Sequence, residues 1–145
     1  FRSVIIKPNQ FEAVGRVNPL PGDEVTRTDL WAVIPRLRAE TAAPVFVTWG
    51  EKGIIISDPE PQLIPAVLVK GPFDPTGAGD SATAGAALTL ASGGTPAEAA
   101  LMGNLVASVT VRQLGTNGTA TPEDLVEPLR LWRDQNVGFE ISSTT

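Results

Sequence analysis

The residues with the clearest chemical potential form one short segment, Asp74-Pro75-Thr76-Gly77-Ala78-Gly79-Asp80. Gly77 and Gly79 have no Cβ, so a ligand can approach their backbone closely, and Ala78 is the next smallest residue. We expect Asp80 in the first turn of the helix that follows. The loop amides and the helix N-terminus would then direct positive charge at one place, which suits a phosphate. The same residues would also form an ordinary glycine-rich turn, in which Asp80 is only a helix cap.

Composition limits the chemistry that is open to this segment. The chain contains no cysteine and no histidine, which excludes disulfides, thiolate metal sites, histidine-ligated zinc and Ser-His triads. A general base must therefore be Asp, Glu or Lys. Oxygen ligands, carboxylates and backbone amides remain, and these groups suit Mg²⁺ and phosphate.

Length, hydropathy and charge indicate the broad class of protein. The 145 residues are 42% hydrophobic, which predicts one globular domain over residues 1–145. No apolar run approaches the length of a membrane span. The 16 acidic and 11 basic residues give a net charge of −5, which argues against nucleic acid or an acidic membrane as a partner. The absence of cysteine agrees with a cytoplasmic location.

The predicted strands surround the segments that carry polar residues. Val4-Ile5-Ile6 is expected to form one strand of a buried parallel sheet. Residues 45–48 and 54–57 predict a hairpin with a tight glycine turn. Residues 63–69 predict two short strand segments broken at Pro65, at a sheet edge or ending early because proline cannot donate to a ladder.

The predicted helices complete an α/β arrangement. Asn9 is placed to cap a short helix, with Glu12 at its third position in a capping box. A helix over about residues 28–40 follows, and two more are expected over 81–91 and 95–114. The last of these carries Asn104 on a mostly buried face, where a polar residue more often satisfies a neighbour than binds a ligand. A final helix is expected from the Thr121-Pro122 start to about Gln135.

The whole segment from Asp74 to Asp80 resembles the C-terminal signature of the ribokinase-like (PfkB-type) carbohydrate kinases, Asp/Asn-x-Ser/Thr-Gly-Ala-Gly-Asp, without a mismatch. The resemblance covers nearly the whole chain but only the C-terminal half of a typical member. It implies the C-terminal half of a three-layer α/β/α fold, the ATP-binding and catalytic part, without the sugar-binding part and lid. The loop Gln113 to Thr116, the later Thr121-Pro122-Glu123 and Ala82 in place of the usual Phe are most similar to the heptose-phosphate kinase branch.

The resemblance also implies roles for individual residues. Asp80 corresponds to the catalytic base, and the amides of Gly77, Ala78 and Gly79 correspond to the anion hole for the transferred phosphoryl group. The positions that correspond to nucleotide contacts are Thr48, Gly50, Gly53, Asn104 and Ser108. The positions linked to cations are Asn9 and Glu12, for Mg²⁺ through water, and Asp74, for K⁺ in some relatives. A glycine-containing loop over residues 114–119 corresponds to one that contacts the nucleotide or a monovalent cation.

The implied function is ATP-dependent phosphoryl transfer to a hydroxyl of a sugar or sugar phosphate, with Mg²⁺ as cofactor and K⁺ as a further candidate. A homodimer is a candidate assembly, and this half alone is expected to be inactive. One alternative is a nucleotide-binding module without catalysis. Another is a dinucleotide-binding oxidoreductase domain, but the loop lacks the G-x-G-x-x-G pattern and lies mid-chain after a run of strands.

Overall fold

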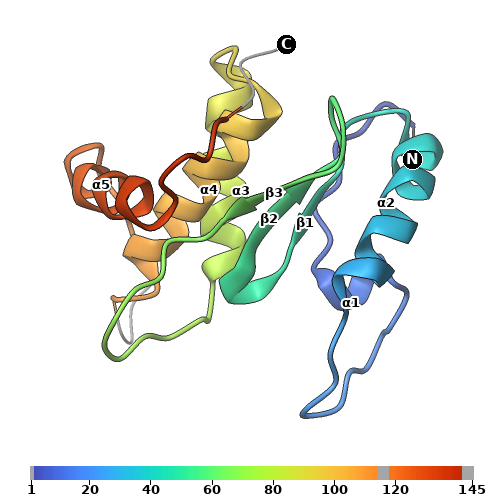
Figure 1. The fold of residues 1–145 in the computed structure, drawn as a ribbon, viewed down its shortest axis with the longest axis horizontal. Coiled ribbons are helices and arrows are strands. Elements are labelled where there is room, and N and C mark those ends of the chain that lie inside the picture. Colours follow the sequence, from blue (N-terminus) through green and yellow to red (C-terminus); the bar gives the residue numbers. More distant parts are fainter. Residues whose placement is uncertain (1, 114–117, 142–145) are drawn as a thin grey trace.

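The computed structural model describes residues 2–113 and 118–141. Its elements form three layers, with a small sheet between two groups of helices (Figure 1). One face of the sheet is covered by α1 (Gln10–Ala13) and α2 (Arg27–Thr41). The other face is covered by α3 (Ala78–Ala91), α4 (Pro96–Thr110) and α5 (Val126–Gln135). The predicted three-layer α/β/α class is therefore confirmed.

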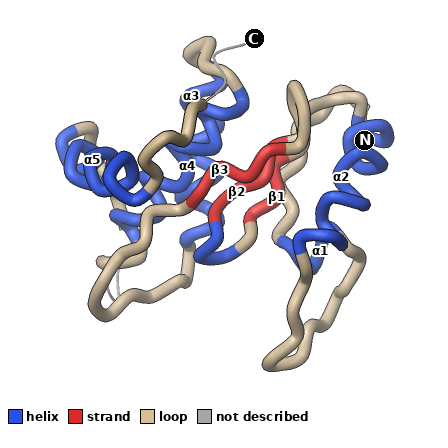
Figure 2. The backbone as a smooth tube through the Cα atoms, viewed as in Figure 1, coloured by secondary structure: helices blue, strands red, loops and turns tan. Residues whose placement is uncertain are grey.

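The sheet is an antiparallel meander of β1 (Phe46–Thr48), β2 (Gly53–Ile56) and β3 (Gln62–Pro65), in that order (Figure 2). The predicted hairpin is present, with Phe46 opposite Ile56. β3 lies at the sheet edge and ends at Pro65, as its missing N–H predicts. The second predicted strand segment is wrong, because residues 66–69 leave the ladder after that proline.

Val4-Ile5-Ile6 is not the buried strand that its composition predicts. Its backbone runs parallel to β1, but only through isolated bridges from Ile6 to Val45 and from Asn9 to Thr48. The side chains of Val4 and Ile5 are each 45% exposed. Within the described residues the segment has a strand on one side only, so neither its outer edge nor these side chains are covered.

Two cores lie on opposite faces of the sheet, because alternate strand residues point in opposite directions. Val45, Val47 and Ile55 pack with Leu30 and Ile34 of α2. The residues between them along the strands point the other way and pack against α3, α4 and α5. These residues are Phe46, Ile54, Ile56 and Ile64.

Side-chain capping boxes begin two of the long helices. Thr26 and Asp29 form a capping box at α2, and Thr95 and Glu98 form one at α4. α2 continues through Pro35, which is exposed. α4 ends at Thr110 rather than near residue 114. The predicted loop at 114–119, with Gly115, lies mostly outside the described residues. In the part of the chain that the structure describes, no helix combines the length and apolarity that a membrane crossing needs.

Small residues bring α3 and α4 together. A Cβ on Gly85 would lie 3.0 Å from Val106 Cγ2 and 3.1 Å from the Met102 carbonyl oxygen. A Cβ on Gly103 would lie 2.9 Å from the Ala82 carbonyl oxygen. Gly85 therefore serves the contact between α3 and α4. The helix that follows the Asp74–Asp80 segment is thus held by a closely packed neighbour.

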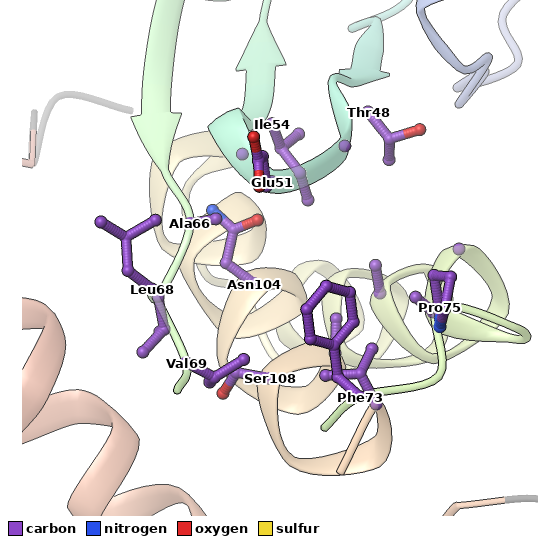
Figure 3. A pocket seen from close by; sticks show the side chains of 18 of the residues that line it. Thr48, Glu51, Ile54, Ala66, Leu68, Val69, Phe73, Pro75, Asn104 and Ser108 are labelled. Atoms are coloured by element: carbon purple, nitrogen blue, oxygen red, sulfur yellow. The ribbon is translucent and has the colours of Figure 1, made fainter. Parts of the chain in front are cut away.

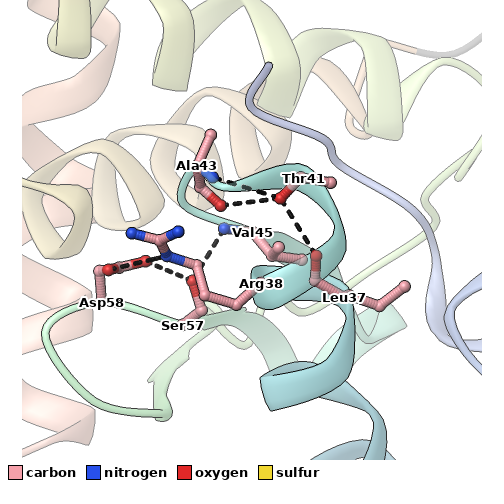
Figure 4. A network of polar contacts seen from close by, with 7 residues as sticks. All are labelled: Leu37, Arg38, Thr41, Ala43, Val45, Ser57 and Asp58. Carbon is pink, nitrogen blue, oxygen red and sulfur yellow. Dashed lines mark hydrogen bonds and ion pairs between the residues drawn. The ribbon is translucent and has the colours of Figure 1, made fainter. Parts of the chain in front are cut away.

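A polar network joins α2 to the ends of β1 and β2 (Figure 4). Arg38 Nε donates to both carboxylate oxygens of Asp58, at 2.9 and 3.1 Å. The Ser57 hydroxyl donates to Asp58 and accepts a hydrogen bond of 2.8 Å from the Val45 amide. The network therefore fixes the layer that contains α2 against the sheet.

Candidate active site

A cavity of about 420 Å³ lies where the β1–β2 turn, α4 and the segment after β3 meet (Figure 3). It is lined by predicted site residues from four separate parts of the chain: Asn9, Thr48, Gly50, Gly53, Ala78, Gly79, Asn104 and Ser108. Its remaining walls are mainly apolar and include Val67, Val69, Phe73, Ala107 and Val111. A largely apolar cavity with a few convergent polar groups is typical of a small-molecule site.

Four predicted site residues lie outside the lining of this cavity: Glu12, Asp74, Gly77 and Asp80. Gly77 and Asp80 flank Ala78 and Gly79, the first two residues of α3, which do line it. Asp80 is exposed in the first turn of α3, as predicted. The cavity and the carboxylate therefore adjoin at the N-terminus of one helix.

The loop amides are not equivalent. Gly77 has a φ of +78° and precedes the first residue of α3. The Ala78 amide donates to the Pro75 carbonyl oxygen at 3.1 Å. Within the described ranges, no acceptor pairs with the amides of Gly77, Gly79 or Asp80. These three donors, at the positive end of a 14-residue helix, are the ones free to bind an anion.

Asp74 anchors the start of the loop. Its amide donates to the Val111 carbonyl oxygen at 2.8 Å, and its Oδ1 accepts a 2.9 Å hydrogen bond from the Thr76 amide. Hydrogen bonds from the Thr76 hydroxyl and amide lower the pKa of Asp74 below its ordinary value. Asp74 is thus a carboxylate at neutral pH, and its observed contacts order the loop.

Asn9 and Glu12 form the capping box that their spacing predicts. Asn9 Oδ1 accepts hydrogen bonds from the Phe11 and Glu12 amides, both at 2.9 Å, and Glu12 Oε2 accepts one from the Asn9 amide at 2.8 Å. The second carboxylate oxygen of Glu12 has no protein partner among the described residues. This oxygen fits a hydrated Mg²⁺, which prefers oxygen ligands and keeps several waters. Among residues 2–113 and 118–141, no group of three or more acidic residues gathers as a metal site.

The β1–β2 turn places backbone at the cavity through two glycines with positive φ, Gly50 at +53° and Gly53 at +120°. Gly53 has no room for a side chain, because a Cβ there would lie 2.2 Å from the Ile64 carbonyl oxygen. The Lys52 ammonium lies 4.1 Å from the centroid of the Trp49 ring and holds the outer side of the turn.

Gly53→Ala is expected to destabilise the protein strongly, because the new Cβ meets backbone on β3 and the φ of +120° suits glycine only. Gly15→Ala is the matched control, since Gly15 has a φ of +77° but open space around it. The control should lose about 1–2 kcal/mol from its backbone conformation, and Gly53→Ala clearly more. Urea unfolding followed by tryptophan fluorescence measures both, and equal losses would contradict the clash.

Asn104 and Ser108 support the cavity from α4. Asn104 Nδ2 donates to the carbonyl oxygens of Ile64 and Pro65, at 2.9 and 3.0 Å, and the Ser108 hydroxyl donates to that of Leu105 at 2.7 Å. Asn104 thus satisfies a neighbour, as its buried position predicts, while still lining the cavity. Its amide oxygen points away from Ala66 (Figure 3).

Lys7 is a candidate functional residue to which the sequence patterns assigned no role. Its Nζ lies 3.7 Å from the position that a Cβ on Gly79 would take. Lys7 also lines a second hollow, with Phe46, Thr83 and Ala86. The ammonium has no ion pair or hydrogen bond within the described residues. The one feature of the sequence that could have indicated a role for Lys7 is its position two residues before Asn9, where the pair of Asn9 and Glu12 begins.

Comparison with known proteins places this geometry in a family. The model of the pfkB family carbohydrate kinases matches residues 3–124. The chain belongs to the pfkB family of carbohydrate kinases, as its residues predict.

Relatives in sequence include bifunctional HldE proteins. The chain is 35% identical over 127 residues to that of Caulobacter sp. (strain K31), covering 86% of this chain and 25% of the relative. It is 30% identical over 142 residues to that of Aeromonas salmonicida (strain A449), covering 97% of this chain and 29% of the relative. These similarities agree with the predicted branch.

Relatives in structure include two solved kinases. Ribokinase from Thermotoga maritima matches with a TM-score of 0.71 at 25% identity, over 87% of this chain and 42% of that one. Phosphofructokinase-2 from Escherichia coli in complex with potassium matches with a TM-score of 0.73 at 22% identity, over 90% and 41%. The chain thus spans from 25% to 42% of the length of these four relatives.

Proposed function

We propose that the protein transfers the γ-phosphoryl group of ATP to a hydroxyl of a sugar or sugar phosphate, and that this chain is its ATP-binding and catalytic part. The observation that carries the proposal is the convergence at the start of α3. There the free amides of Gly77, Gly79 and Asp80, the unpaired Lys7 ammonium and the apolar cavity adjoin one another. Such a site suits a ligand with an apolar, flat end and a highly anionic end.

Different groups of the chain have different roles in the proposed transfer. The three free amides hold the oxygens of the transferred phosphoryl group, and Lys7 neutralises charge on the same oxygens. The Asp80 carboxylate, one residue beyond Gly79, orients the acceptor hydroxyl and takes its proton as the new O–P bond forms. ADP leaves as the other product. Thr48, Gly50 and Gly53 border the phosphates, while Asn104 and Ser108 border the nucleoside.

Asn9 and the free carboxylate oxygen of Glu12 would hold Mg²⁺ through its waters. When bound, the ion supplies neutralisation of phosphate charge. Asp74 has one oxygen engaged with Thr76, and a role in holding K⁺ stays a prediction for the other oxygen.

The direct test is ADP release by the intact protein, with ATP, Mg²⁺ and a panel of sugars and sugar phosphates, and mass spectrometry of the product. A phosphorylated sugar is the expected result. ATP binding without ADP release across the panel would instead support a nucleotide-binding module. Binding of NADH in place of ATP, followed by fluorescence, would support the dinucleotide alternative.

A further inference from the structure

One wall of the cavity continues beyond the end of its strand. Residues 66–69 line the cavity, but they follow Pro65, the last residue of the edge strand β3. The Ala66 amide still donates to the Lys52 carbonyl oxygen at 3.2 Å. Beyond Ala66, no neighbouring strand holds this wall in the described part of the chain.

Side chains from α4 and α5 take the place of the missing strand. Asn104 donates to the carbonyl oxygens of Ile64 and Pro65, and Trp132 Nε1 donates to that of Pro65 at 2.8 Å. Asn104 and Trp132 are 6% and 4% exposed. Replacing either would leave a buried carbonyl group with fewer partners and damage the core as well.

Gln135, the last residue of α5, holds the wall further along. Its Nε2 donates to the Leu68 carbonyl oxygen at 3.0 Å, and its Oε1 accepts from the Leu68 amide at 2.9 Å. One side-chain amide thus makes the pair of hydrogen bonds that a neighbouring strand residue would make. Gln135 is exposed, so water can replace these bonds at small cost to folding.

We propose that Gln135 is a positioning residue for nucleotide binding, which fixes residues 66–69 as the wall against which the nucleobase lies. This inference rests on the proposed function. Val67 and Val69 of this wall face a cavity that Phe73, Ala107 and Val111 also line, and such an apolar slot suits the flat base. A wall that is already ordered adds little entropic cost when the nucleotide binds. A loose wall lowers the apparent affinity in proportion to the fraction of molecules in which the wall is in place.

Gln135→Ala in the intact protein tests the proposal by calorimetric titration with ATP and with inorganic tripolyphosphate. The Kd for ATP should rise about three- to tenfold, because a smaller fraction of the molecules would have the wall in place. The Kd for tripolyphosphate should stay unchanged, because that probe has no base to contact the wall. The turnover at saturating ATP should also be unchanged. Asp134→Ala, exposed on the same helix turn, is the matched control.

Hydrogen exchange at the Leu68 amide shows whether the wall has been released. Faster exchange in Gln135→Ala together with an unchanged Kd for ATP would overturn the proposal. An equal loss of affinity for ATP and tripolyphosphate would overturn it too, because it would indicate a general structural effect. If the unaltered protein binds no ATP, the proposed function itself fails, and this inference fails with it.

Discussion

Asp80→Asn is expected to lower turnover of the intact protein in the proposed reaction by about 10²–10⁴-fold, the usual contribution of a positioned general base. The amide has nearly the shape of the carboxylate but cannot take the proton of the acceptor hydroxyl. Asp80 is exposed and outside the lining of the cavity, so the Kd for ATP and the unfolding transition should change little. Steady-state ADP release and a nucleotide titration measure the two effects separately.

Asp134→Asn on α5 is the control for this substitution, because it removes the same charge from an exposed position on a different helix. It should leave turnover unchanged. Turnover of Asp80→Asn within a factor of a few of the unaltered enzyme would remove Asp80 from the mechanism. A matching loss of ATP affinity would instead place its role in ground-state binding.

Lys7→Met is expected to lower kcat by about 10²-fold, comparable with removal of one donor from an oxyanion site. Methionine preserves the apolar stem that lies with Phe46 and Ala86, but it removes the ammonium beside Gly79. The loss should be larger in kcat than in the Kd for ATP, because charge on the phosphoryl oxygens is neutralised most effectively during transfer. Single-turnover measurements at saturating ATP report this step.

Lys70→Met serves as the control for Lys7→Met, since Lys70 is an exposed lysine that does not line the cavity. Its kinetics should match those of the unaltered protein. Equal effects of the two substitutions would mean that general electrostatics, and not a specific contact, explains the loss.

Much of the fold follows from local rules that the sequence displays. The capping boxes at Asn9 and Thr95 and the early end of β3 at Pro65 need only neighbouring residues. The exposure of Val4 and Ile5 could not be predicted in this way. Burial of an apolar run depends on which elements lie beside it, and the run itself does not contain that information.

The candidate site was likewise predictable from the sequence only in part. The Asp74–Asp80 segment and the glycine turn were predicted from residue types and resemblance. The structure brings residues of both segments to one cavity. It also shows that the Ala78 amide is bonded inside the loop and that Lys7 reaches Gly79. The first depends on the turn geometry at Pro75, and the second on how the segment before α1 packs against α3. Neither leaves a periodic pattern in the sequence.

The two cores on opposite faces of the sheet give the cavity two independent supports. Asn9, on one side of the cavity, belongs to the layer of α1 and α2, which packs around Leu30. Asn104, on another side, belongs to the layer of α3, α4 and α5. A substitution in one core therefore reaches the cavity from one side only. Under the proposed function, the Asn9 side that would hold the metal and the Asn104 side that would border the nucleobase therefore rest on separate cores.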